Sequence, residues 1–308
     1  MNYWKFIFIN LLVVLVANTH SFGQGCSDAG FCSLGSMRSS QISDTLHSSI
    51  AVSQSIGMGE EEVIILTTQL EMKLMPWKNG LISVKAPYAF VSGNLGNING
   101  PGDLTFSYTH KIIQNGNYYV MLNVGGKIPS NASDKTNQEG KPLPMGYQTS
   151  LGTSDLIIGA SFYYKNWHFA IGYQHPFNRN ENGFLHSIPA WADNEDAEEY
   201  FESNKFKRGD DVMLRIERRF PKPKITYFAG LLPIVRIQKD EIIKNDTTIA
   251  LDGSNSLTIN LNVGLLYKVS KQTDFNISLG FPTIFRKVRA DGLTRFFNLT
   301  VGLEKKFR

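Results

Sequence analysis

The sequence predicts an all-β protein, an antiparallel transmembrane β-barrel of about twelve strands with short periplasmic turns and long extracellular loops. Three features of the 308 residues predict it: an export signal, segments in which apolar and polar residues alternate, and connections that are short and long in turn. Alternation marks a strand with two different faces, because successive side chains point to opposite sides. Bacterial outer-membrane barrels combine such strands with short turns at one end and longer loops at the other.

The N-terminus has the layout of a secretory signal peptide. Lys5 supplies a positive charge, residues 6–17 form an apolar run, and small residues stand at positions 21 and 23. We therefore assign residues 1–23 to the signal and exclude them from the fold. The run is too short for a transmembrane helix, which needs about 20 apolar residues.

Residues 24–44 form a Ser- and Gly-rich segment before the first strand, and they carry both cysteines, Cys26 and Cys32. In an oxidising periplasm this pair is expected to form a disulfide that closes a short loop. A soft-metal or redox site helped by Met37 is the alternative, but the spacing matches no usual zinc pattern, so we expect no metal and no cofactor. Lipidation of Cys26 is disfavoured because Gly23 stands where an aliphatic residue is needed. The segment is expected either to plug the lumen or to hang in the periplasm.

Twelve alternating segments follow one another within residues 45–308, which we assign to the barrel. The clearest is 66–74, where leucine and methionine side chains share one face and Thr, Gln, Glu and Lys share the other. The predicted strands are 46–56, 66–74, 82–88, 104–109, 118–127, 154–165, 167–175, 210–219, 224–238, 256–268, 273–285 and 294–306. Pro233 and Pro282 fall inside two of them and predict bulges or strand ends, because proline cannot donate a ladder hydrogen bond.

The connections between these strands alternate in length. Turns rich in turn-forming residues are expected at 76–80, 114–117, 165–166, 221–223 and 270–273. Longer polar links are expected at 91–102, 129–153, 176–209, 239–255 and 286–293. The short set indicates the periplasmic end of a barrel and the long set the extracellular end.

Aromatic residues fall at both ends of the predicted strands, as expected where such rings sit at membrane interfaces. The periplasmic set is Trp77, Tyr118, Tyr164, Trp167, Tyr227 and Tyr267, and the extracellular set is Tyr88, Phe90 and Tyr173. A soluble β-sandwich would scatter these rings and would leave strand edges to protect. The sequence therefore favours a barrel in the outer membrane of a Gram-negative bacterium.

Composition narrows the partners. The formal charge is +4, and it falls to +3 once the signal removes one lysine and no acid, a mild value that argues against nucleic acid. The expected partners are outer-membrane lipid, a small solute, and the assembly machinery, which reads a terminal aromatic residue such as Phe307.

Charged residues on the polar faces are candidates for lining the lumen: Glu71, Lys85, Lys127, Asp155, His168, Arg215, Glu217 and Arg236. Glu71 is expected beside Lys85 across the turn at 76–80, and inward charges of this kind mostly pair and fill space. Alternatively, Lys85, Arg215 and Arg236 form an anion-attracting wall, since rings of charge set pore selectivity. Because about eight strands leave a filled barrel and about sixteen leave a channel, twelve strands are compatible with a narrow passage.

The longest predicted link, 176–209, contains a stretch over 191–202 that favours a short acidic helix. It is expected either as a solvated surface loop or as a gate folded into the mouth. Trp191, Tyr200 and Phe201 need an apolar surface to cover and are the gate candidates.

No enzyme is expected. The chain has no Gly-x-Ser-x-Gly elbow, and no histidine has a sequence-evident serine partner. A lipid-modifying enzyme would need a serine within hydrogen-bond reach of a histidine at the barrel rim.

Residues 146–161, Gly-Tyr-Gln-Thr-Ser-Leu-Gly-Thr-Ser-Asp-Leu-Ile-Ile-Gly-Ala-Ser, lead into a hairpin that ends near Tyr173. This stretch resembles a loop and hairpin of the outer-membrane proteins linked to the meta-pathway of phenol degradation. The chain is also similar to long-chain fatty acid transporters, whose N-terminal segment plugs the barrel. The resemblance implies uptake of small, often hydrophobic molecules. We thus expect a channel or transporter, with a structural anchoring barrel and a lipid-modifying enzyme as alternatives.

Overall fold

The computed structural model describes residue 37 and residues 46–192, 194–292 and 295–307. The predicted signal peptide, the predicted Cys26–Cys32 disulfide and the rest of the segment 24–44, apart from Met37, lie outside the described residues.

The chain folds into antiparallel strands with very little helix. Twelve strands form the barrel wall: β1 (Ser48–Gly59), β2 (Ile64–Trp77), β3 (Gly80–Gly93), β5 (Leu104–Asn115), β6 (Tyr118–Ile128), β7 (Asp155–Tyr164), β8 (Trp167–Pro176), β9 (Asp211–Pro221), β10 (Ile225–Arg236), β13 (Leu257–Lys268), β14 (Thr273–Ile284) and β15 (Arg295–Phe307). The short elements outside it are η3 (Glu60–Glu62), β4 (Gly96–Pro101), η4 (Met145–Tyr147), α2 (Glu195–Glu198), β11 (Glu241–Lys244) and β12 (Thr247–Ala250). Among the described residues, no helix is long and apolar enough to cross a membrane.

The sheet closes on itself. Each wall strand pairs with its sequence neighbours, β1 pairs with β15, and the β2–β3 pairing completes the ring. Strand β4 continues the line of β5, because residues 80–85 of β3 pair with β5 and residues 88–93 pair with β4. The prediction of a twelve-stranded antiparallel barrel is confirmed.

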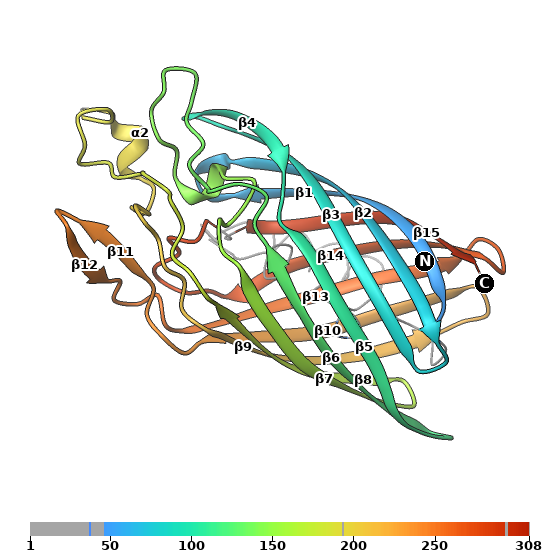
Figure 1. The fold of residues 1–308 in the computed structure, drawn as a ribbon. Coiled ribbons are helices and arrows are strands. Elements are labelled where there is room, and N and C mark those ends of the chain that lie inside the picture. Colours follow the sequence, from blue (N-terminus) through green and yellow to red (C-terminus); the bar gives the residue numbers. More distant parts are fainter. Residues whose placement is uncertain (1–36, 38–45, 193, 293–294, 308) are drawn as a thin grey trace, which may run out of the picture.

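The two ends of the barrel differ as predicted, with two exceptions. Figure 1 shows β4, α2, β11 and β12 gathered at one end, opposite the end at which the chain finishes. The loop-side link after β1 is only residues 60–63, and the expected link at 91–102 is instead a hairpin of β3 and β4 turning at Asn94-Leu95. The hairpin extends there because the backbone N–H of Leu95 donates to the Tyr147 hydroxyl at 3.0 Å and the Leu95 side chain is buried.

The barrel wall has an apolar outer face and a largely polar inner face. On β2, Leu70, Met72 and Leu74 are each more than 40% exposed, whereas Glu71 and Lys73 between them are buried. An exposed apolar band of this kind suits a bilayer, which solvates no backbone polar group and admits sheets only as closed barrels. Five of the six aromatic residues of the predicted periplasmic girdle are exposed on the same outer face, and Tyr118 is half-buried. The five are Trp77, Tyr164, Trp167, Tyr227 and Tyr267.

Both strand prolines disturb the ladder. At Pro282 the register of β14 against β13 shifts, since Ile259 pairs with Ile284 and Asn260 with Pro282. At Pro233 the register is kept, but the pairing of β10 with β9 runs from Leu231 directly to Ile234. The missing N–H of proline accounts for both interruptions.

Candidate functional site

The eight charged residues that the sequence places on the lumen face are all buried in the barrel. They fall into three groups along the wall, each containing acids and bases. The groups centre on Glu71 with Lys85, on Glu217 with His168 and Arg215, and on Lys127, Asp155 and Arg236.

The first group lies toward the short turns. Glu71 and Lys85 are direct partners in the β2–β3 register, as the turn at 76–80 predicts, with 4.0 Å between Nζ and Oε1. Lys73 bridges from Glu71 to Glu304 of β15, with its Nζ 2.8 Å from Glu304 Oε1. Ser83 Oγ donates to Glu71 at 3.0 Å. These contacts tie together the strands on either side of β1.

The second group surrounds Glu217 of β9. Arg219 Nε donates to Glu217 Oε1 at 3.0 Å, and Arg215 Nη1 lies 3.7 Å from Glu217 Oε2. The His168 ring stacks on Tyr163, with 4.2 Å between the ring centroids. His168 is fully buried, and neither ring nitrogen has a hydrogen-bond partner in the described part of the chain. Its Nδ1 is 3.8 Å from Glu217 Oε1, beyond hydrogen-bond distance, so the stacking on Tyr163 is the contact that holds the ring here.

The third group is a belt of alternating charge near the loop end of the barrel. Lys127 lies between two acids, with its Nζ 3.2 Å from Asp103 and 3.3 Å from Asp155. Arg208 continues the series, 3.7 Å from Asp155 and 3.5 Å from Asp211. Lys127, Asp155 and Arg208 thus each have opposite charges on both sides, which offsets part of the cost of burying them.

Arg236 is the centre of this belt. Its guanidinium binds Asp211 through two hydrogen bonds of 2.9 Å each, the fork geometry that arginine and a carboxylate form best. The same guanidinium donates to Asp240 at 2.8 Å and lies 3.0 Å from Asp291. Arg286 in turn binds Asp291 at 2.7 Å. One arginine at the end of β10 therefore fastens two loops to the wall.

The two loop carboxylates respond differently to this environment. Burial raises the pKa of Asp240, and the neighbouring arginines only partly offset it. Burial also disfavours ionisation of Asp291, but Arg286 and Arg236 outweigh it and hold the pKa of Asp291 well below its usual range. Asp291 is therefore the more firmly ionised partner of Arg236.

The three cations considered for an anion-attracting wall, Lys85, Arg215 and Arg236, lie in three different groups. Each has a carboxylate within 4.0 Å. The structure does not bring them together.

The long loop that follows β8 folds over the mouth instead of standing in solvent. Trp191 is 3% exposed and donates from its indole nitrogen to the Pro142 carbonyl at 2.7 Å. The Tyr200 hydroxyl donates to Asn94 at 2.6 Å and lies 3.2 Å from the Tyr147 hydroxyl, and burial raises the pKa of both phenols. These rings form one apolar cluster with inward residues of β3 and the β1–β2 link: Val63, Ile65, Ala89, Val91, Leu95, Leu143, Tyr147, Phe184, Trp191, Ala197 and Tyr200. We call this cluster the cap.

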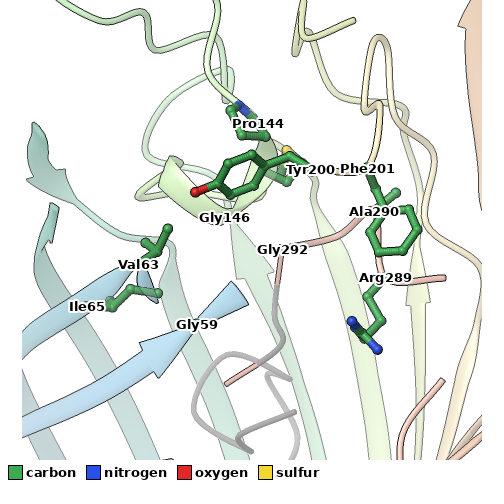
Figure 2. Close-up of a pocket in the computed structure, with 11 residues that line it drawn as sticks. Gly59, Val63, Ile65, Pro144, Gly146, Tyr200, Phe201, Arg289, Ala290 and Gly292 are labelled. Atoms are coloured by element: carbon green, nitrogen blue, oxygen red, sulfur yellow. The ribbon is translucent and has the colours of Figure 1, made fainter. Parts of the chain in front are cut away.

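The third gate candidate, Phe201, borders a small hollow beside the cap. Figure 2 shows Val63 and Ile65 on one side of it and Phe201 and Arg289 on the other, with Tyr200 between them. Its volume of about 20 Å³ has room for roughly one water molecule. The Arg289 guanidinium lies over the Phe201 ring at 5.8 Å, so the loops after β8 and β14 meet here.

Two glycines beside the cap provide a matched test of its packing. A Cβ on Gly93 would overlap the Tyr147 hydroxyl and would lie 2.9 Å from Val63 Cγ2, whereas a Cβ on Gly146 would meet nothing. We expect Gly93→Ala to displace the Tyr147 ring at a cost of roughly 1–3 kcal/mol, as overpacking does, and to loosen the cap. Gly146→Ala is the control. Limited proteolysis of the loops in proteoliposomes should be faster for Gly93→Ala alone, and equal rates would show that the cap does not depend on this contact.

Met37 is the described residue of the segment before the barrel, and it lies inside the lumen. Its side chain is fully buried and packs with Ile157, Ala170 and Met213, among other inward residues of β7 to β10. Its sulfur occupies the space that a Cβ on Gly159 would take. The glycine therefore makes a socket for this methionine within an apolar patch of the inner wall.

Sequence reasoning missed the loop half of the charge belt. Asp103, Arg208, Asp240, Arg286 and Asp291 lie just outside the strands, where the two-residue period no longer says which way a side chain points. A group of charged residues at either end of a predicted link is the sequence signal that could have identified these loop residues. Here that signal is present at 208–211 and at 286–291.

The closed ring, apolar outer face and polar inner face define the class: the chain has the fold of an outer-membrane β-barrel. No protein-family model matches the sequence. A search of curated proteins also finds no match.

Solved structures with a similar fold are outer-membrane proteins. The COG4313 outer membrane channel from Pseudomonas putida F1 superposes with a TM-score of 0.63 at 13% identity, over 88% of this chain and 99% of that one. The NanC porin gives a TM-score of 0.48 at 13% identity, over 84% and 100% of the two chains. The CymD monoaromatic hydrocarbon channel gives 0.42 at 10% identity, over 93% and 98%. At these identities the likeness concerns the fold, and the first superposition supports the barrel over nearly its whole length.

Proposed function

We propose that this protein is an outer-membrane channel or transporter for a small solute. The observation that carries the proposal is the closed barrel of twelve strands with a polar inner face. Its strand number lies between that of barrels filled by side chains and that of barrels with an open channel. The similarly folded protein from Pseudomonas putida is described as an outer membrane channel, which supports the same role here.

The solute class follows from the resemblance of residues 146–161, which favours small molecules with hydrophobic character. In the structure this stretch runs from η4 in the cap into β7. It therefore lies where a solute would pass from the loops to the wall. The resemblance to proteins linked to phenol degradation remains part of this proposal.

The residues proposed to act on the solute are those that line the path. We assign the three buried charge groups to the lumen wall and Trp191, Tyr200 and Phe201 to a gate at its outer end. The gate role is supported by their burial in and beside the cap. The cap packs on the inward-facing side chains at the loop-side ends of β2 and β3.

The segment 24–44 is proposed as a plug, supported by the position of Met37 in the lumen. A disulfide between Cys26 and Cys32 would close a small loop within it. Mass spectrometry of the alkylated protein with and without reductant tests the disulfide, since two thiols should react only after reduction.

Membrane lipid is the proposed environment of the outer wall. Across β5 to β9 this wall has a shallow apolar hollow of about 870 Å³ whose lining includes Leu122, Ile158, Ala160 and Ile171. We also propose recognition of the final strand by the outer-membrane assembly machinery.

A structural anchoring role is the second candidate, and the paired charges favour it. Three groups of buried ion pairs occupy the inner face, and the cap packs over the mouth. Such a barrel would display its loops without conducting.

Single-channel recording of the refolded protein in a planar bilayer separates the two candidates. A channel should give discrete ion-conductance steps. Folding is confirmed independently by the heat-dependent mobility shift of the barrel on a gel. Silence from folded protein, and also from folded protein lacking residues 24–44, would contradict the open-channel proposal and favour the anchor.

A further inference from the structure

The inner face of β13, β14 and β15 differs from the rest of the lumen. Through the middle of these strands its polar side chains are short and uncharged, and the one large apolar side chain among them is Leu266, beside Asn276. The polar residues are Asn260, Asn262, Asn276, Ser278, Asn298 and Thr300. We call these six residues the amide wall. The charged groups described above lie mainly on β2 to β10 and their loops.

Glycines keep the amide wall thin. Asn262 Oδ1 lies 2.9 Å from the position that a Cβ on Gly280 would take, and Asn276 Nδ2 lies 2.8 Å from the corresponding point on Gly302. Each amide thus lies flat over a neighbouring strand, in space that only glycine leaves open. On this side the wall extends little into the lumen except at Gly264, where the Phe228 ring of β10 lies over the strand.

Three atoms of the amide wall are buried without a hydrogen-bond partner among the described residues. They are Asn260 Oδ1, Asn262 Nδ2 and Asn298 Oδ1, although Asn298 Nδ2 donates to Thr300 at 3.1 Å. Buried polar atoms are nearly always paired, so these amides need a partner beyond the described residues, and we take water or a solute as that partner.

Two of the described residues before the barrel pack against the opposite half. Met37 packs against β7 to β10, and Leu46 packs against Leu81, Met121 and Tyr163. The third, His47, lies 3.7 Å from Glu304 at the short-turn end of β15, beyond the amide wall.

We propose that the solute path follows the amide wall and that its solutes are small uncharged molecules bearing hydroxyl groups. This inference rests on the proposed channel function and replaces the hydrophobic character that the resemblance of residues 146–161 favours. An amide offers both a donor and an acceptor, as a hydroxyl does, and it attracts neither sign of charge. Several weak sites in series suit permeation, because a solute must leave each site as readily as it enters.

Liposome swelling with glucose and glucuronate tests the solute class, because the two rings have similar size and differ in charge. Wild-type protein should admit glucose faster. Equal rates, or faster entry of glucuronate, would overturn the inference.

A double variant tests the path itself. Asn262→Leu with Asn298→Leu should slow glucose entry about fivefold, since losing one neutral hydrogen bond changes a local binding constant by about that factor. Asn123→Leu makes the same change on β6, in the charged half, and should leave glucose entry within twofold of wild type. Equal slowing in both would place the path elsewhere.

A nearly isosteric variant covers the case in which the double variant does not fold. Asn262→Asp should slow glucuronate by repulsion while glucose entry is kept, and unchanged selectivity would count against the amide wall. Planar-bilayer conductance separates this inference from the function on which it rests. Ion steps without a preference for the neutral sugar overturn only the inference, whereas folded protein without steps or swelling overturns the channel as well.

Discussion

Met37→Glu is expected to raise the single-channel conductance of the protein several-fold. Met37 occupies an apolar socket beside Gly159, within a cluster that includes Ile157 and Met213. A carboxylate placed there without a partner would cost several kcal/mol, so the side chain would leave the socket. The residues that precede the barrel would then lose this anchor inside the lumen.

Two further variants serve as controls for the conductance of Met37→Glu. Met37→Leu keeps an apolar side chain of similar volume and should conduct like wild type. Deletion of residues 24–44 removes the whole segment and sets the upper limit that Met37→Glu should approach. If the deletion and Met37→Glu both conduct like wild type, the segment does not restrict flow, and the plug proposal fails.

The strands could be predicted because each has one face toward lipid and one toward the lumen. Leu70 and Met72 are exposed on the bilayer side while Glu71 between them is buried. The alternation of apolar and polar residues in the sequence therefore matches the two-residue period of the strand. The eight charged candidates chosen by the same period are all buried in the structure, and their role in lining a path stays a prediction. Predicted and observed strands differ mainly at their ends.

The loops could not be predicted in this way. Tyr147 is far from Trp191 and Tyr200 in sequence, and the three meet only because two loops fold together over the loop-side ends of β2 and β3. The partners of Arg236 come from three places for the same reason: β9, the link after β10 and the link after β14. The socket for Met37 depends on Gly159, and a glycine in a strand does not reveal what will fill the space it leaves.

The second large effect is expected at Arg236. Arg236→Met should lower the free energy of unfolding by about 3–5 kcal/mol, because removing one partner of a buried ion pair leaves the other partners charged and unsatisfied. Here the loss leaves Asp211, Asp240 and Asp291 facing one another with only neighbouring cations to offset them. The midpoint of urea unfolding, followed by the mobility shift on gels, measures the change.

Arg218→Met is the matched control. Arg218 is a partly exposed cation at the other end of β9, where its guanidinium lies 4.9 Å from the Trp167 ring. The loss should be about 0.5–1 kcal/mol, typical of an exposed cation–π contact. Arg236→Lys adds a second comparison, since lysine keeps the charge but loses the two-fold hydrogen bond to Asp211. Equal destabilisation by Arg236→Met and Arg218→Met would mean that the belt contributes no more than a surface contact.

Replacing each of the two loop carboxylates by asparagine should change the stability of the barrel by different amounts. Because the pKa of Asp291 is held below the ordinary value of 3.8, its ionised form is the one that stabilises the fold. That contribution is fully present above pH 3.8 and is lost as the pH falls through the lower folded-state pKa. The pKa of Asp240 is raised by burial, so its contribution has the opposite sign and is lost as the pH rises through the raised value. At neutral pH, Asp291→Asn should therefore destabilise the barrel clearly more than Asp240→Asn, and the reverse order of urea midpoints would show that Arg236 depends chiefly on Asp240.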